Sequence, residues 1–266
     1  MLSSINTTTN LDKSQSLIQT SVQRLSSAKR INSAADNPAG LAIADAISSR
    51  FGGQNQAIGN IGKGLSLAET AGSALTQVTD NLQRIRELTV QAGNSSLSAS
   101  DRQSIQDEIN GLGKSIDGIA GNTQFNDQKL LDGSFSGQLQ IGPNPGDTLG
   151  LSLGNVSSAA LGVSGLDVSS ATNAANALDT IDSAINNVGN EQSNLASTAA
   201  GLSSNLANLN SSYQNLAETR SRIQDTDYAQ TAADLNKGKV QNQVANYALK
   251  LYQDNQKAAS ALLTGL

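Results

Sequence analysis

A ladder of core positions in the C-terminal half of the chain limits its fold more than any other feature. The positions follow one another in steps of three and four residues, and all but Gln192 and Arg220 are apolar or aromatic. They are Leu178, Ile181, Ile185, Val188, Gln192, Leu195, Ala199, Leu202, Leu206, Leu209, Tyr213, Leu216, Arg220 and Ile223. A mean step of about 3.5 residues keeps one helix in register with a partner helix. At ~1.5 Å per residue the helix is a rod about 70 Å long, so the chain is expected to pack lengthwise.

Two further ladders lie in the N-terminal half. The longer one comprises Ile47, Phe51, Gln54, Ile58, Ile61, Leu65, Ala68, Gly72 and Leu75, and continues through Val78, Leu82, Ile85 and Leu88. The shorter one comprises Ile105, Ile109, Leu112, Ile116 and Ile119, and Ser100 and Gln103 before it have the spacing of a capping box. Rods that cannot bury their stripes alone form bundles. The predicted fold class is mainly α: a long antiparallel bundle of coiled-coil rods with a small β-hairpin.

Both ends of the chain carry weaker helical patterns. Pro38 follows Asp36 and Asn37 and breaks the first segment, residues 1–35, from the next helix. Apolar positions in this segment are Leu11, Ile18, Val22 and Leu25. The far C-terminus steps by four and three through Val240, Val244, Tyr247, Leu251, Asp254, Ala258 and Ala261. Because each terminal helix is too polar to be a core alone, the two are expected to pair.

The pattern changes after the third ladder. Apolar residues alternate between Gln138 and Leu153 around the turn 142–147, which contains Pro143 and Pro145. This alternation predicts a β-hairpin near 138–153. Segment 154–171 is rich in Gly, Ser and Ala and is expected to loop over the surface.

Composition excludes several function classes. The chain has no Cys and no His, which removes thiol and imidazole chemistry and the usual zinc ligands. A net charge of −5 without a basic run argues against nucleic acid. No apolar run approaches the ~20 residues of a membrane span, and the N-terminus lacks the layout of a cleavable signal. We predict no catalytic site, cofactor or metal, and no binding to nucleic acid or membrane.

Several stretches resemble the signatures of bacterial flagellins. They are LSSAKRINSAADNPAGLAIAD at 25–45, NLQRIRELTVQAGN at 81–94, GNTQFNDQKLLDG at 121–133, SRIQDTDYA at 221–229 and QKAASALL at 256–263. The resemblance implies the subunit of the flagellar filament, with an inner core of terminal helices and an outer core of longer rods. Only about forty residues, from Ser134 to roughly Thr172, separate the flanking helices. This resembles a minimal flagellin without a large variable outer domain.

The expected organisation follows from the resemblance and the ladders together. Residues 1–42 are the N-terminal inner-core helix and linker, 43–226 the outer-core rods, and 227–266 the C-terminal inner-core helix. The predicted inner-core assembly seam is Leu11, Ile18, Val22, Leu25, Val240, Val244, Tyr247, Leu251 and Ala258. The predicted outer-core seam is Leu178, Ile181, Ile185, Val188, Leu195, Leu202, Leu209 and Leu216. The terminal helices are expected to become ordered only when neighbouring subunits cover them.

Partners are implied by the same resemblance. The chain is expected to polymerise with itself, to leave the cell without a cleavable signal peptide, and to form part of an extracellular flagellum. An export chaperone is expected on the stripe from Val240 to Leu251, together with hook-junction and cap proteins at the filament ends. Gln83, Arg84, Leu88 and Glu108 match positions through which similar flagellins are recognised by a host toll-like receptor. For Arg84 and Glu108 a contact between helices or subunits is the favoured interpretation.

Three other classes stay open at this point. A hook-filament junction or cap protein shares terminal heptads. A secreted helical adaptor would stay monomeric or form small closed oligomers. A helical hydrolase would need a carboxylate or Ser/Lys site, and no such pattern is found in the sequence.

Overall fold

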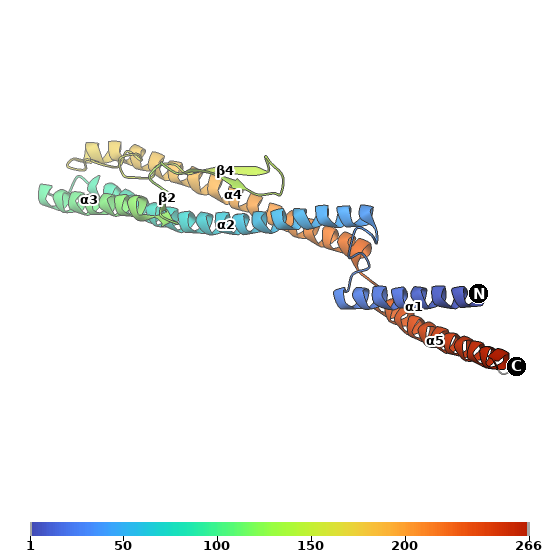
Figure 1. Cartoon of the computed structure of the whole chain (residues 1–266). Helices are drawn as coiled ribbons and strands as arrows, with labels where there is room; N and C mark the ends of the chain where they lie inside the picture. The colour runs from blue at the N-terminus through green and yellow to red at the C-terminus, as the bar shows by residue number, and fades with distance from the viewer. Residues whose placement is uncertain (1, 265–266) are drawn as a thin grey trace. The chain divides into compact units, whose positions relative to one another are not determined.

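The computed structural model describes residues 2–264, with side chains from residue 8 to residue 261. The elements are α1 (Leu2–Ser27), α2 (Pro38–Ala92), α3 (Ala99–Asn122), β1 (Gln124–Phe125), β2 (Gln128–Lys129), β3 (Ser136–Gln140), β4 (Thr148–Ser152), α4 (Ala171–Gln224) and α5 (Tyr228–Thr264) (Figure 1). The predicted fold class is confirmed: long helices dominate, and the strands form small antiparallel pairs.

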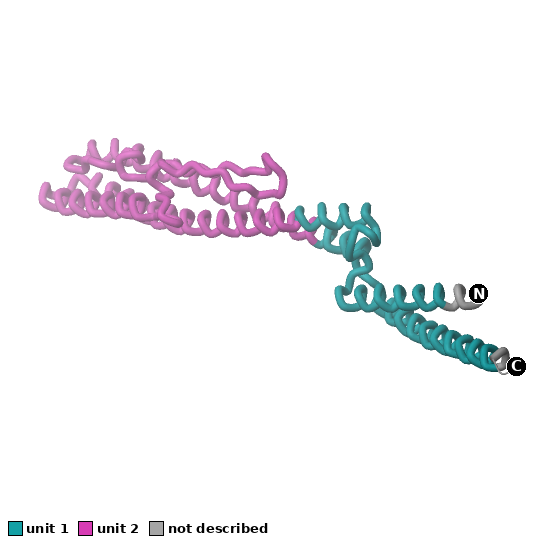
Figure 2. Tube along the Cα trace, in the orientation of Figure 1, with its two compact units in different colours: residues 1–50, 214–266 teal, residues 51–213 magenta. Residues whose placement is uncertain are grey.

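The chain forms two compact units, which Figure 2 colours separately. Unit 1 contains residues 1–50 and 214–266, and unit 2 contains residues 51–213. The limits predicted at 42/43 and 226/227 concern the assembled state and stay a prediction. The predicted break before Pro38 is where α2 begins.

Antiparallel rods form the centre of unit 2. Gln54 Nε2 on α2 donates to Ser212 Oγ on α4 at 2.9 Å. Further along α2, Arg86 Nε donates to Asp182 Oδ1 at 2.6 Å. Because α2 residues with higher numbers contact α4 residues with lower numbers, the two helices run in opposite directions. Their ladders bury apolar side chains against each other, which is the main source of stability for such a pair.

Helix α3 packs on the same core through Ile105, Ile109 and Ile116, which are buried. The capping box predicted at Ser100 and Gln103 is wrong. The helix begins at Ala99, so Ser98 is the N-cap: its Oγ accepts from Asp101 N at 3.2 Å, and its own N–H donates to Asp101 Oδ2 at 3.0 Å. The box lies two residues earlier because an Asp can serve at the third helical position as a Glu or Gln does.

A β-hairpin formed by β3 and β4 lies on the rods. Leu139 pairs with Leu149 across the hairpin, and the connecting turn contains Gly146 at φ 91°. Leu139 sits over Gly64 of α2, where a Cβ would collide with Leu139 Cδ2. The missing side chain at Gly64 therefore lets the hairpin approach the helix backbone.

The segment after the hairpin differs from its prediction as a surface loop. It is irregular, yet Val156, Leu161, Val163 and Val168 are buried in the main core of unit 2. The Asp117 carboxylate on α3 also accepts hydrogen bonds from the segment's Ser158, from N–H at 2.8 Å and from Oγ at 2.9 Å. A few apolar side chains among the Gly and Ser residues are therefore enough to pack this segment on the core of unit 2.

The Asp101 capping box predicts an acid-dependent loss of helix stability. Hydrogen bonds from the Ser98 hydroxyl and N–H hold the pKa of Asp101 below its usual value of 3.8. Because the folded-state pKa is depressed, the stabilisation is present above pH 3.8 and is lost as the pH falls through the lower folded pKa. Urea unfolding followed by circular dichroism should show wild type more stable than Asp101→Asn at neutral pH, with the difference shrinking in acid. A difference that stays constant as the pH is lowered through this range would contradict the assignment.

Candidate functional site

The terminal helices α1 and α5 pack side by side in unit 1. Asn242 Nδ2 on α5 donates to Ser14 Oγ on α1 at 3.2 Å. A Cβ at Gly238 would lie 3.0 Å from Ile18 Cγ1. Because α1 residues with higher numbers contact α5 residues with lower numbers, the pair is antiparallel, and the start of α1 lies at the same end of the pair as the end of α5 (Figure 1).

The face of α5 toward α1 consists mainly of small and polar residues. Seven of the buried or half-buried positions of α5 follow one another in steps of four and three: Thr231, Leu235, Gly238, Asn242, Ala245, Leu249 and Tyr252. Sequence reasoning missed this seam, because only Leu235, Leu249 and Tyr252 in it are large. The signal available was the spacing of fourteen residues between the two leucines, which is two heptads.

The face of α1 toward α5 also buries few large apolar side chains completely. Leu11, Ile18 and Leu25 from the predicted seam are half-buried, and Ser14 and Ser21 between them are buried. Val22, also predicted there, is 48% exposed. Small side chains let the backbones approach closely, but they bury little apolar area. The intrachain contact between α1 and α5 is therefore weak for its length.

Four large residues of α5 point away from α1. Their exposed fractions are 59% for Val240, 62% for Val244, 65% for Tyr247 and 48% for Leu251. These four residues, called the α5 stripe below, belong to the predicted seam, as does Ala258, which is also exposed. Steps of four, three and four place them on one side of the helix. Helix α5 thus has two packing faces, of which α1 covers one.

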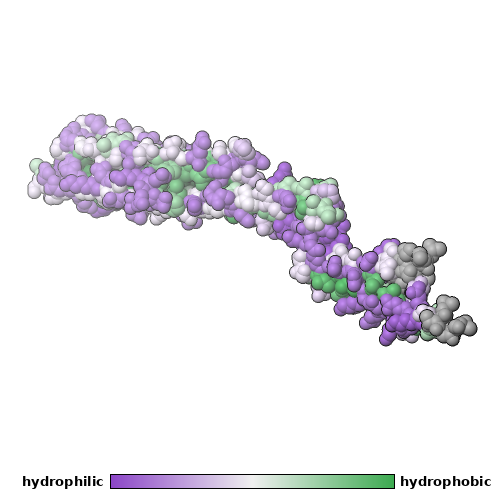
Figure 3. Space-filling model, in the orientation of Figure 1, coloured by the Kyte–Doolittle hydropathy of each residue, from purple (hydrophilic) through white to green (hydrophobic). Residues whose placement is uncertain are grey.

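A shallow groove adjoins the α5 stripe. It measures about 480 Å³ and is lined by Asn10 and Lys13 of α1 and by Val240, Val244 and their neighbours on α5. In the space-filling view, hydrophobic atoms gather along this pair of helices between hydrophilic ones (Figure 3). The surface is long and narrow, which suits another helix better than a small molecule.

The predicted outer-core seam lies inside unit 2, apart from Leu216, which is half-buried in unit 1. Ile181, Val188, Leu195, Leu202 and Leu209 are buried. Leu178 and Ile185 are half-buried. Most of this seam is therefore occupied by contacts within one chain.

The residues predicted for a host receptor divide into two groups. Gln83 and Arg84 are exposed, and Arg84 Nη2 donates to Glu108 Oε1 at 2.8 Å across α2 and α3. Hydrogen bonds to Glu108 and Glu87 raise the pKa of the Arg84 guanidinium above its usual value. Leu88 is only 2% exposed and lies in the core of unit 2, so its side chain is not on the surface of this folded state, and its part in a receptor contact stays a prediction. Its ladder position, shared with Ile85, is the reason.

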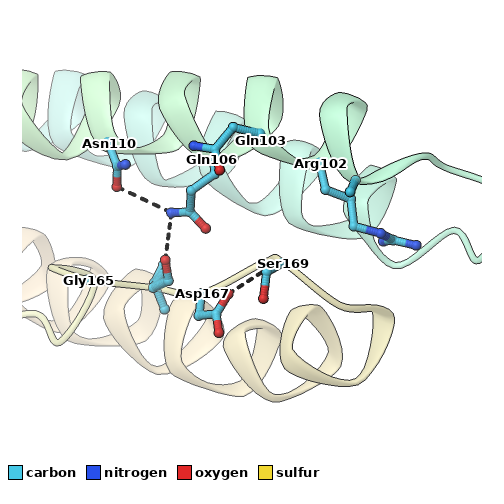
Figure 4. A pocket seen from close by; sticks show the side chains of 9 residues that line it. Arg102, Gln103, Gln106, Asn110, Gly165, Asp167 and Ser169 are labelled. Carbon is cyan, nitrogen blue, oxygen red and sulfur yellow. Dashed lines mark hydrogen bonds between the residues drawn. The ribbon is translucent and has the colours of Figure 1, made fainter.

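A polar pocket of about 500 Å³ lies between α3 and the segment 165–169 (Figure 4). Gln106 joins the two, donating from Nε2 to Leu166 O at 2.7 Å and accepting from Val168 N at 2.9 Å. Arg102 points away from this bridge and donates to Ala92 O and Asn94 O, capping the end of α2. These side chains are engaged in holding elements together. Among the described residues, no three His, Cys, Asp or Glu side chains are grouped to hold a metal.

No helix in the described part of the chain has the length and apolar character needed to cross a membrane.

Both ends of the chain match known family models. Residues 1–136 match the bacterial flagellin N-terminal helical region, and residues 178–262 match the bacterial flagellin C-terminal helical region. The chain belongs to the bacterial flagellin family. The unmatched residues between the two regions include the β4 strand and the partly buried irregular segment.

Curated flagellins are similar over the same regions. A flagellin of Escherichia coli O127:H6 is 43% identical over 178 residues, which are 67% of this chain and 32% of the relative. The phase 2 flagellin of Salmonella typhimurium is 44% identical over 168 residues, 63% of this chain and 33% of the relative. The chain thus spans about a third of the length of these relatives.

Solved structures share the fold. A Bacillus cereus flagellin superposes with a TM-score of 0.53 at 29% identity, over 57% of this chain and 88% of that one. A putative flagellar hook-associated protein of Vibrio parahaemolyticus gives a TM-score of 0.60 over 71% of this chain and 100% of that one. Its 14% identity shows a common fold alone.

The α1·α5 pairing can be tested by cross-linking, because the chain has no Cys of its own. The double variant Ser14→Cys, Asn242→Cys places two thiols where side chains already hydrogen-bond, so mild oxidation should close an intrachain disulfide. The control variant Val22→Cys, Val244→Cys puts them on exposed positions of the same helices and should stay reduced. Electrophoretic mobility without reductant reads the result. Equal cross-linking of the two pairs would show that the seam is misplaced.

Proposed function

We propose that this chain is the structural subunit of a bacterial flagellar filament, assembling with copies of itself into an extracellular helical polymer that turns rotation into thrust. The observation that carries the proposal is the exposed α5 stripe on a chain whose two ends both match flagellin. A minimal form is supported by the short connection between α3 and α4, residues 123–170, which contains two small strand pairs and an irregular segment.

The energetics of the terminal helices favour assembly. A fully buried Val, Leu or Tyr side chain contributes about 1.5–3 kcal/mol, and the α5 stripe leaves roughly half or more of four such side chains in water. The seam between α1 and α5 recovers little of this energy, because several of its buried or half-buried positions are small or polar, among them Ser14, Ser21, Gly238 and Asn242. A neighbouring subunit that covers the stripe supplies the missing burial. Contacts between different surfaces of identical subunits form a helical filament when the rotation between subunits does not close into a ring.

The role is structural rather than enzymatic. Flagellins are a family of filament proteins, and the polar side chains of Gln106 and Arg102 beside the pocket hold structural elements together. A hook-filament junction protein or a secreted helical adaptor is the alternative function. The flagellin matches at both ends favour the filament subunit, because the likeness to a hook-associated protein extends to the fold alone.

Partners before and after assembly use the same surfaces. An export chaperone covers the α5 stripe until the chain enters the export channel. Hook-junction and cap proteins contact the ends of the polymer through the surfaces that subunits present to each other. These roles rest on family membership and on the exposure of the stripe.

Recognition by a host toll-like receptor is a further part of the proposal. Its supporting residues are Gln83, Arg84 and Glu108, which remain accessible on α2 and α3, whereas the buried Leu88 contributes by supporting the helix. The ion pair between Arg84 and Glu108 holds α2 to α3 in any case, and that packing role is the primary one.

Replacing one residue of the stripe should separate folding from assembly. In Leu251→Asp a carboxylate takes the place of an apolar contact, and burying it costs several kcal/mol unless it is protonated. We expect no sedimentable polymer under conditions that polymerise wild type. Circular dichroism should still show the cooperative melt of unit 2, which does not include this position.

Gln253→Asp is the matched control, because it adds the same charge two residues further along α5, at an exposed position outside the stripe. It should polymerise as wild type does. Normal filaments from Leu251→Asp, or failure of both variants, would reject the stripe as the assembly surface.

A further inference from the structure

Lysines border the α5 stripe along its length. Lys239, Lys250 and Lys257 are exposed, and their spacings of about three and two helical turns place them along one side. On the other side, Lys13 of α1 lines the groove beside Val240 and Val244. Lys237 is exposed one turn before Val240. The apolar line, about 16 Å long from Val240 to Leu251, therefore has cations on both flanks, and the exposed Asp254 places one carboxylate at its C-terminal end, between Lys250 and Lys257 in the sequence.

The charge of unit 1 reinforces this pattern. It has eleven basic and eight acidic side chains, a net charge of +3, while unit 2 has six and fourteen, a net charge of −8. The described ion pairs are made by arginines, and none involves a lysine of α5. The charges beside the stripe are thus available to an external anion.

The sequence predicted no membrane binding, because no apolar run is long enough to span a bilayer. Against that prediction, we propose that the α5 stripe and its lysines bind the free chain to a lipid surface that carries anionic headgroups. A helix with an apolar line flanked by lysines lies in the plane of a bilayer interface, with its apolar side chains among the upper acyl chains and its ammonium groups among the phosphates. Tyr247 suits this position, because its ring is apolar and its hydroxyl is polar. The helix lies on the membrane and does not cross it.

The lysines select a lipid surface as the occupant. A neighbouring subunit that covers the stripe satisfies the four apolar side chains, but nothing in that role requires cations on both flanks. Anionic headgroups around an acyl layer match the apolar line and the lysines together. Because both occupants use the same four side chains, lipid binding and polymerisation exclude each other.

The test uses the full chain, freshly dissociated to monomers, with vesicles of phosphatidylcholine alone or mixed with phosphatidylglycerol. Flotation measures the bound fraction. Wild type should bind the mixed vesicles and not the neutral ones. Lys239→Gln together with Lys250→Gln should weaken binding about 25-fold, since each lysine near an anionic surface contributes about fivefold. The control, Lys63→Gln with Lys114→Gln, removes the same charge from exposed positions of unit 2 and should change binding less than about twofold.

Three outcomes of the vesicle experiment would overturn the proposal. Equal losses of binding in the two lysine variants would show that the chain is attracted by its overall charge and not by the α5 stripe. Equal binding to neutral and mixed vesicles would show that the lysines play no part. No binding to mixed vesicles would show that the α5 stripe is not a lipid-binding surface. Polymerisation of each protein is measured separately without vesicles. A chain that binds vesicles but never polymerises would reject the filament and leave the lipid surface standing. A chain that polymerises but binds no vesicles would reject the lipid surface and leave the filament standing.

Discussion

The structure of unit 1 depends on one constraint: α5 has two packing faces, and the chain provides one helix to cover them. Helix α1 takes the face with Gly238 and Asn242, where small side chains allow a close approach. The face with Val244 and Tyr247 stays in water. Leaving large apolar side chains exposed along a line is costly for an isolated protein, and it is typical of surfaces that bind something else. The second face of α5 is therefore where function is expected.

Unit 2 shows what the same kind of helix does when its partners are present in the chain. Nearly all of the largest fully buried side chains, such as Ile61, Ile85 and Ile181, belong to it, and Ile31 is the exception in unit 1. Rods α2 and α4 cover each other, while α3, the hairpin and the irregular segment 154–170 close the remaining sides. A unit with its own core holds its shape without neighbours. One chain thus contains a unit with a complete core and a unit with an incomplete one, and we expect the first to supply rigidity and the second to supply the assembly surface.

Sequence periodicity predicted the parts of the fold where large apolar side chains repeat. The ladder through Ile181, Val188 and Leu202 gave α4, and the pattern before β3 and β4 gave the hairpin, because burial of big side chains leaves a strong signal. The seam of α5 with α1 escaped prediction because close helix packing there uses Gly238 and Asn242, whose types do not mark a core.

Other differences have equally local causes. Leu88 belongs to the buried ladder of α2, so its likeness to a receptor contact could not be judged without knowing which face of the helix is covered. The predicted capping box of α3 lay two residues too late because Ser98 and Ser100 are both suitable N-cap residues. Only the position of Asp101, three residues after Ser98, decides between them. For the terminal helices, the sequence indicated an apolar stripe on each. That α5 has two packing faces could be recognised only from the structure.

Hydrogen exchange compared between monomer and polymer tests the central claim most directly. If one face of α5 lacks a partner in the single chain, amides in residues 228–261 should exchange fast in the monomer and become strongly protected in the polymer. Amides of α2 and α4 within unit 2 should be protected in both states. Equal and strong protection of α5 in the dilute monomer would show that α1 alone completes its core, and it would contradict this account.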